Sequence, residues 1–131
     1  MKKSFAILAL LATAACSGVP SNIDGDQVFF AFDSAEISKD AKKDLKKQAL
    51  YLKKNTDKQI TLQGRCDERG STEYNLALGA RRANAAKAVI VNDGVDSKRI
   101  STISYGKERP LVQGSGEEVW KWNRNATTTV K

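Results

Sequence analysis

Apolar residues recur every three or four positions in two long stretches of the chain, and they alternate with polar residues in several short ones. The first long stretch is predicted to form a helix with Ser38 as its N-cap and an end near Asn55. Its apolar stripe contains Ala41, Leu45, Ala49 and Leu52. The lysines between positions 39 and 58 lie largely off this stripe, so they are expected to form the solvent-exposed face of the helix.

The second helix is predicted to begin between Ser71 and Glu73, with Ser71 or Thr72 as its N-cap, and to stop by 92–94, where Gly94 suits a left-handed position. Its sheet-facing stripe is expected to contain Leu78, Ala85 or Ala86, Val89 and Ile90, and Asn75 and Arg82 share that face. An arginine on an apolar stripe requires a partner, because burying an unpaired guanidinium is costly.

Short runs of β-branched and aromatic residues predict four strands, at 27–32, 59–64, 100–105 and 125–130. Phe29 and Phe30 of the first strand are expected to lie in the core. Between the last two strands the pattern favours a long loop at 106–116 and a helical turn at 117–123. Strand, helix and strand in succession form a βαβ unit, so the chain is α+β in character.

The first 16 residues depart from this globular pattern. A basic start, an apolar centre and small residues before Cys16 are typical of a secretory signal, and the apolar run is too short to span a bilayer. The segment resembles a bacterial lipoprotein signal in which Cys16 becomes the lipidated first residue, although Thr13 stands where leucine is usual. A plain signal peptidase site is the competing interpretation. Ser17 resembles the residue that follows the cysteine in lipoproteins sorted to the outer membrane.

The expected organisation is therefore a lipoprotein signal peptide at 1–15, a lipidated N-terminus and linker at 16–26, and one globular domain at 27–131. Acyl chains on Cys16 would provide an effectively permanent membrane anchor.

The amino-acid composition excludes several kinds of functional site. The chain has 131 residues, no histidine and two cysteines, which excludes a zinc cluster, a Ser-His-Asp triad and a Cys-His pair. No metal and no cofactor are expected. The net charge of +7 is compatible with a nucleic acid, an anionic membrane or a polyanionic wall polymer. Nucleic acid is disfavoured, because the aromatic residues do not interleave with the lysines as stacking platforms do.

The most informative stretch is 64–82, where a turn rich in glycine and charge leads into the second helix. A turn on a rigid scaffold can present Asp67, Glu68 and Arg69 to a ligand. We interpret this stretch as a site for a zwitterionic, carboxylate-bearing molecule. Two alternatives remain: a stabilising salt bridge between Asp67 and Arg82, and a wall-acting hydrolase with paired carboxylates among Asp67, Glu68 and Glu73, for which no group that would raise a pKa is evident.

Three segments carry a resemblance to a known family: GRCDERGSTEYNLALGARRANAAK, ISYGKERP and WNRNA. They resemble the C-terminal OmpA-like peptidoglycan-binding domain and, within this family, the peptidoglycan-associated lipoproteins of Gram-negative envelopes. The likeness extends from Val28 to about Val130. It implies a βαβαββ sandwich in which a four-stranded mixed sheet packs against two main helices.

The resemblance also implies noncovalent binding of the diaminopimelate residue in the peptidoglycan stem peptide. The positions that match are Asp67 for the ammonium group, Arg82 for a carboxylate, Phe32 and Asp33 at the end of the first strand, and Asn75 and Leu78 beside them. The family implies a protein that is not an enzyme, anchored in the outer membrane through Cys16, with its domain in the periplasm, tethering membrane to wall. Its implied partners include TolB and other Tol proteins, and the alternative is a structural wall-binding lipoprotein without Tol contact.

Three positions depart from the family pattern. Arg65 stands where the family often has His or Asn, which is expected to add positive charge near the pocket. Cys66, beside Asp67, is expected to be a small buried side chain, and an intermolecular disulfide is the alternative. Asn125 replaces the second arginine of the usual Asn-Arg-Arg-Ala and leaves Arg124 alone.

Overall fold

The computed structural model describes residues 18–131, so the expected signal peptide at 1–15 and the lipidation at Cys16 lie outside the described residues. One mixed sheet holds β1 (Gln27–Phe29), β2 (Ile60–Arg65), β3 (Ile100–Gly106) and β4 (Asn125–Val130), in the order β1-β4-β2-β3. β2 and β3 are parallel, and β4 is antiparallel to both β1 and β2. The expected α+β fold with a four-stranded mixed sheet is confirmed.

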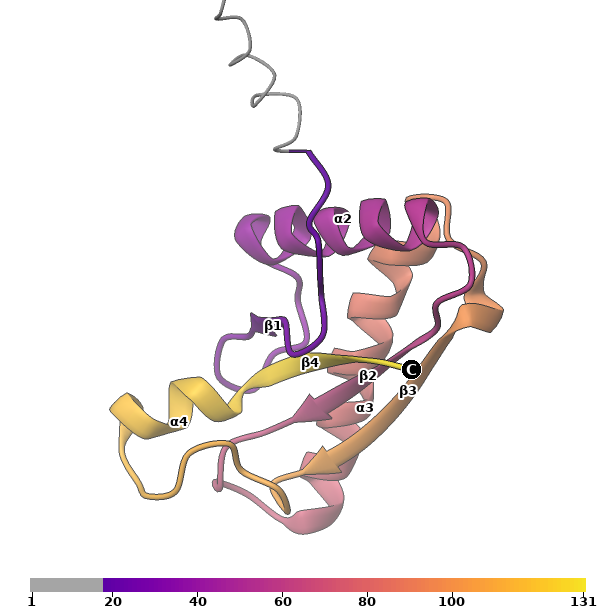
Figure 1. Cartoon of the computed structure of the whole chain (residues 1–131). Coiled ribbons are helices and arrows are strands. Elements are labelled where there is room, and N and C mark those ends of the chain that lie inside the picture. The colour runs from indigo at the N-terminus through magenta and orange to yellow at the C-terminus, as the bar shows by residue number, and fades with distance from the viewer. Residues whose placement is uncertain (1–17) are drawn as a thin grey trace, which may run out of the picture.

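Two main helices, α2 (Lys39–Lys54) and α3 (Thr72–Asn92), are joined to the sheet by short connections, and η2 (Ser97–Arg99) and α4 (Glu117–Asn123) are shorter. In Figure 1, α3 lies behind β2 and β3, and α2 crosses the upper end of the molecule. The core lies between these helices and one face of the sheet. It contains Leu45 and Leu52 of α2, Ile90 of α3, and Ile60 and Leu62 of β2, all with no exposed surface.

The predicted N-cap Ser38 is confirmed, and of the two candidates for α3 the structure has Ser71 as the N-cap. The hydroxyl of Ser38 accepts a hydrogen bond from the amide of Ala41 at 3.1 Å, and that of Ser71 accepts one from Tyr74 at the same distance. Gly94 follows α3 with a φ of 108°, in the left-handed region that glycine favours. The local signals that start and end a helix were therefore sufficient to place α2 and α3.

The first strand is shorter than predicted. The carbonyls of Phe30 and Ala31 accept hydrogen bonds from the side chains of Arg124 and Arg82 instead of from a neighbouring strand, so β1 ends at Phe29. Phe29, expected in the core, is 37% exposed and packs edge-on against Trp122. The alternation of a strand explains this, because Val28 and Phe30 point inward and Phe29 must point the other way.

The predicted βαβ unit is split. β1 and β2 run in the same direction, but β4 lies between them and pairs with both. The sequence contained no signal for this insertion, since the pairing partner of a strand far along the chain does not follow from local pattern.

The end of the predicted linker belongs to the domain. Ile23 is completely buried in the core. The amide of Gly25 donates to the carbonyl of Thr128 at 2.7 Å, and the Asp24 carboxylate accepts from the amide of Val130 at 2.8 Å. The domain therefore begins near Ile23 instead of at residue 27. Across residues 18–131, no helix has the length and apolar character that crossing a membrane requires.

A glycine pair brings α3 against the sheet. A Cβ added to Gly64 of β2 would lie 1.8 Å from the carbonyl oxygen of Gly79, and one added to Gly79 of α3 would lie 2.3 Å from Oγ of Ser104. Backbone therefore contacts backbone at this crossing. Arg82 follows Gly79 by three residues on the same helix, so this contact also sets how deeply Arg82 is buried.

Gly64→Ala should destabilise the fold by about 2 kcal/mol or more, because the new methyl group meets rigid backbone and the helix must move away. Urea unfolding followed by circular dichroism measures the change. Gly18→Ala is the control, since a Cβ there meets nothing within 4 Å, and it should change stability by less than about 0.5 kcal/mol. Equal unfolding midpoints for the two variants would contradict the close packing.

Candidate functional site

A pocket of about 380 Å³ lies among the loop after β1, the loop between β2 and α3, and the first turns of α3. Its lining includes all six residues predicted to bind the ligand, namely Phe32, Asp33, Asp67, Asn75, Leu78 and Arg82. The remaining lining residues are Cys66, Arg69, Gly70, Ser71 and Tyr74. The fold brings the predicted set together, and the role of this set in binding stays a prediction.

Helix α3 contributes Asn75, Leu78 and Arg82, whose spacings of three and four residues place them on one helix face. The side-chain amide of Asn75 donates to the carbonyl of Arg69 at 2.7 Å, which fastens the loop before α3 to the helix. The predicted position of these residues on a single stripe is confirmed by their burial.

Arg82 lies at the inner end of the pocket and is 1% exposed. Its guanidinium donates to three backbone carbonyls: Ser34 at 2.8 Å, Arg65 at 2.9 Å and Ala31 at 3.0 Å. Burial lowers the pKa of this guanidinium from its usual value. These bonds use three of the five N–H donors of an arginine, which leaves two for a ligand.

The salt bridge between Asp67 and Arg82, one of the two alternatives drawn from the sequence, is not formed. Among residues 18–131, the ion pairs of Asp67 are with Arg69 at 2.8 Å and Arg124 at 3.4 Å, and Arg82 has no carboxylate within ion-pair distance. Carbonyl dipoles solvate the buried charge of Arg82 but do not neutralise it. The inner end of the pocket therefore keeps a net positive group.

Asp67 is 4% exposed and accepts four hydrogen bonds. One carboxylate oxygen accepts from the amide and Nε of Arg69, both at 3.1 Å, and the other accepts from Nη2 of Arg69 and Nη1 of Arg124. Burial by itself raises the pKa of Asp67, but the bonds from the two arginines outweigh it and leave the pKa below its usual value. The carboxylate is thus held in its charged form.

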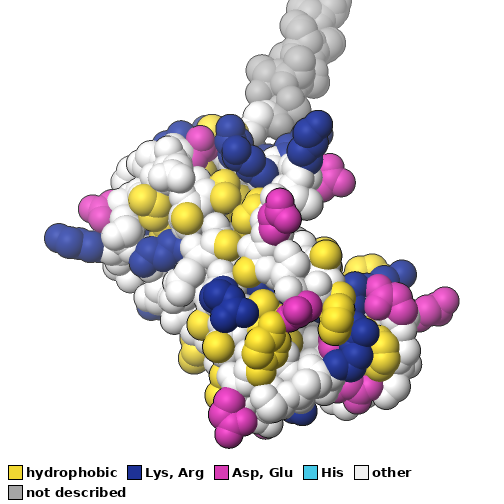
Figure 2. Space-filling model, turned by 180° about the vertical axis from the view of Figure 1, so that it is seen from behind, with side chains coloured by type: hydrophobic (Ala, Val, Ile, Leu, Met, Phe, Trp, Pro, Cys, Tyr) yellow, Lys and Arg dark blue, Asp and Glu magenta, His cyan; other side chains and the backbone are white. Residues whose placement is uncertain are grey.

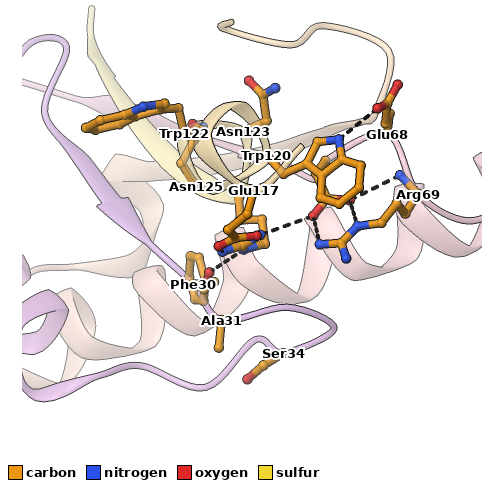
Figure 3. Close-up of polar contacts among 12 residues, drawn as sticks. Phe30, Ala31, Ser34, Glu68, Arg69, Glu117, Trp120, Trp122, Asn123 and Asn125 are labelled. Atoms are coloured by element: carbon orange, nitrogen blue, oxygen red, sulfur yellow. Dashed lines mark hydrogen bonds and ion pairs between the residues drawn. The ribbon is translucent and has the colours of Figure 1, made fainter. Parts of the chain in front are cut away.

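Arg69 is sandwiched between two aromatic rings. Its guanidinium carbon lies 3.9 Å from the ring centre of Phe32 and 4.0 Å from that of Trp120. The indole N–H of Trp120 donates to Glu68 at 2.7 Å, as Figure 3 shows above the guanidinium of Arg69. Glu68 also accepts from Ser115. The charged loop is therefore attached to α4 and the loop before it, which lie about 50 residues further along the chain.

Asp33, in the loop after β1, also lines the pocket and has a strained backbone conformation, with a φ of 55° that non-glycine residues rarely adopt. The hydroxyl of Tyr74 donates to its carboxylate, and this bond raises the pKa of Tyr74. The pocket wall thus holds two carboxylates, Asp33 and Asp67, and two guanidinium groups, Arg69 and Arg82. A balanced set of opposite charges suits a zwitterionic ligand.

One expectation about the departures from the family pattern is corrected. The side chain of Arg65 is outside the pocket lining, and it donates to the carbonyl of Arg109 at 2.8 Å and lies over the ring of Tyr105. Its charge is therefore directed away from the pocket. Asn125 is completely buried and bonds Trp122 and Thr127, which makes it part of the turn into β4.

Cys66 is buried as expected. Its thiol donates to the carbonyl of Asn75 at 3.2 Å, and burial raises its pKa. Sequence reasoning left Arg69 out of the predicted binding set and missed Tyr74 and Arg124. The pairing of Arg124 with Asp67 spans 57 positions, and no local pattern reports it.

Comparison with known proteins decides the family. The family model described as the OmpA family matches residues 29–124. The chain belongs to the OmpA family. Among solved members, it is similar to the peptidoglycan-associated lipoprotein from Burkholderia pseudomallei, with a TM-score of 0.78 and 38% identity over 80% of this chain and 89% of that one. The C-terminal domain of Helicobacter pylori MotB shares the fold, with a TM-score of 0.73 at 22% identity over 84% and 85% of the two chains.

Curated relatives are similar in sequence over about three quarters or more of this chain. The peptidoglycan-associated lipoprotein of Mesorhizobium japonicum is 49% identical over 106 residues, which cover 81% of this chain and 63% of that protein. That of Haemophilus influenzae is 40% identical over 99 residues, or 76% and 65%. The chain therefore spans less than two thirds of the length of these relatives.

The lowered pKa of Asp67 predicts a contribution to acid sensitivity. The unfolded state takes up the proton at higher pH than the folded state, so the stabilisation is full at neutral pH and is lost as the pH falls through the usual range of an aspartate toward the lower folded pKa. Asp67→Asn should therefore flatten the fall in the urea midpoint between about pH 5 and pH 3. Asp57→Asn, in an exposed turn outside the site, is the control. An unchanged pH profile for Asp67→Asn would contradict the arginine pairing.

Proposed function

We propose that the pocket binds the diaminopimelate residue of a peptidoglycan stem peptide noncovalently. The observation that carries this proposal is the buried guanidinium of Arg82, whose three hydrogen bonds go to backbone carbonyls and which retains two N–H donors. A carboxylate is the ligand that such a group binds best, because two parallel N–H donors match two carboxylate oxygens. In this proposal Arg82 receives a carboxylate of diaminopimelate.

The ammonium group of the same ligand end is proposed to bind Asp67. The four bonds that Asp67 already accepts fill the lone-pair sites of a carboxylate, so an ammonium group takes the place of one arginine contact. Arg69 is the more exposed of the two arginines, and its side chain is the one that moves aside. Asp33 supplies a second negative charge to the pocket lining.

The names of similar proteins support peptidoglycan as the source of this ligand, since the curated relatives are called peptidoglycan-associated lipoproteins. A hydrolase is not favoured. The pKa of Asp67 lies below its usual value, whereas the general acid of a hydrolase needs a raised pKa.

We further propose that Cys16 is acylated and anchors the chain in the outer membrane, so that the domain in the periplasm links membrane and wall. The support is the signal-like sequence of 1–15 with a cysteine directly after it, together with the lipoprotein names of the relatives.

Substitution of the two central charges should weaken binding of a diaminopimelate-containing tripeptide, measured by isothermal titration calorimetry. Arg82→Lys and Asp67→Asn should each reduce the affinity by roughly 10- to 100-fold, because each removes a hydrogen bond between charged groups.

Arg99→Lys is a matched control for Arg82→Lys. Arg99 also donates to three backbone carbonyls, those of Leu52, Asn55 and Lys58, but it lies outside the pocket. Both arginine variants should lower the melting temperature of the protein. Arg82→Lys should also weaken binding of the tripeptide, whereas Arg99→Lys should leave it unchanged. Wild-type affinity in both site variants would refute the site assignment.

We also propose that the chain forms a complex with TolB and other Tol proteins, and the support is the resemblance to peptidoglycan-associated lipoproteins. Immobilised TolB should retain the purified chain, and an excess of the diaminopimelate tripeptide should release it if the two ligands compete. Failure of TolB to retain the chain would favour the alternative of a structural wall-binding lipoprotein without Tol contact.

A further inference from the structure

Helix α2 carries the whole net charge of the described chain. It has seven lysines and two aspartates, a net charge of +5, whereas the rest of residues 18–131 has 13 basic and 13 acidic residues and is neutral. The positive charge is therefore segregated onto one element and is not spread over the surface.

The lysines of α2 form one face. All seven are exposed, and at 3.6 residues per turn they fall within an arc of roughly 140°. Leu50, 37% exposed, lies in the middle of this arc. Within residues 18–131, Lys53 is the lysine of α2 with an acidic partner, Asp93 at 3.9 Å.

Several of these lysines also repel one another. Lys39 and Lys43, Lys42 and Lys46, and Lys43 and Lys47 lie four residues apart, a spacing at which like charges destabilise a helix. The lysine face therefore costs the helix stability, and a partner with negative charge would relieve that cost.

The described chain begins beside this helix. Pro20 lines a cavity of about 240 Å³ together with Asp44 and Lys47 of α2, and Ile23 is fixed in the core. Figure 1 shows the indigo N-terminal segment passing α2, and Figure 2 shows dark-blue side chains on both sides of the place where it leaves the domain.

Six residues separate Cys16 from Ile23, and the seven Cα-to-Cα steps between them span at most about 25 Å when fully extended. With Cys16 acylated as proposed above, the end of the domain that bears α2 is held close to the lipid headgroups.

We propose that the lysine face of α2 binds the anionic phospholipid headgroups of the membrane that holds the anchor. Lysines near an anionic surface are attracted within a Debye length of about 8 Å, and Leu50 offers an apolar contact among them. The inference rests on the proposed anchor only for the short distance between α2 and the lipid headgroups. The charge and exposure of α2 do not depend on the anchor.

This contact orients the ligand pocket. In Figure 1 the loop between β2 and α3 lies at the end of the molecule opposite α2. A domain that rests on the membrane through α2 therefore presents the Asp67 loop away from the lipid, toward the wall.

The test uses the chain purified from membranes with its anchor and reconstituted into phosphatidylcholine vesicles with or without phosphatidylglycerol. Reductive methylation of lysines is followed by mass spectrometry. Lys39, Lys43 and Lys46 should react several-fold more slowly on the anionic vesicles, and salt near 1 M, where the Debye length is about 3 Å, should restore their rates. Lys87 and Lys98, outside α2, should react equally on both kinds of vesicle.

Two variants with the same loss of charge sharpen the test. One replaces lysines of α2: Lys42→Gln, Lys43→Gln, Lys46→Gln and Lys47→Gln. The other replaces lysines elsewhere: Lys87→Gln, Lys98→Gln, Lys121→Gln and Lys131→Gln. Each lysine near an anionic surface raises the affinity for it roughly fivefold. The first variant should therefore lose the protection of Lys39 and Lys54 from methylation, and the second should keep it.

Flotation of the vesicles separates this inference from the anchor. Flotation with both lipid mixtures but equal methylation rates overturns the inference and leaves the anchor standing. Flotation with anionic vesicles alone, lost in the α2 variant, supports the α2 surface and contradicts the anchor. If the chain floats with neither lipid mixture, both the α2 surface and the anchor are contradicted. Protection of the α2 lysines by isolated peptidoglycan sacculi, but not by anionic vesicles, would assign the face to the wall and overturn the inference.

Discussion

The guanidinium of Arg82 joins three parts of the chain that are distant in sequence. From its place on α3 it bonds Ala31 and Ser34 in the loop after β1 and Arg65 at the end of β2. These segments form the walls of the pocket, so a single buried side chain both shapes the pocket and supplies its positive charge. A cation held by carbonyl dipoles remains available to an anionic ligand, which a cation already paired with a carboxylate would not be.

Arginine to carbonyl contacts recur across the domain. Arg99 closes the turn between α2 and β2 through the carbonyls of Leu52, Asn55 and Lys58. Arg124 bonds the carbonyl of Phe30 and pairs with Glu117 and Asp67. A planar group with five donors satisfies carbonyls where a strand or helix ends, and this makes the irregular connections as well defined as the regular elements.

The predictable parts were those specified by neighbouring residues. Ser38 and Ser71 placed the helix starts, the apolar stripes placed Leu45 and Leu78 inside, and the family motifs assembled the pocket residues. The unpredicted parts depend on contacts between distant residues. The position of β4 between β1 and β2, the clamp of Arg124 on Asp67, and the stacking of Arg69 on Trp120 all join segments about 50 or more residues apart. Neither periodicity nor turn chemistry carries information about such pairs, and the burial of Ile23 was missed for the same reason.

The central position of β4 fixes the order in which this sheet can form. β1 pairs with β4 alone and β2 pairs with β3 and β4, so β1 has no sheet partner until residues 125–130 are available. A chain that emerges N-terminus first, from a ribosome or from a membrane channel, can pair β2 with β3 early but cannot complete the sheet until its last strand appears. The core beneath β1, including Val28 and Ile23, closes at the same moment. Emergence of the chain and final folding are therefore separate steps in time, and the C-terminal strand sets the boundary between them.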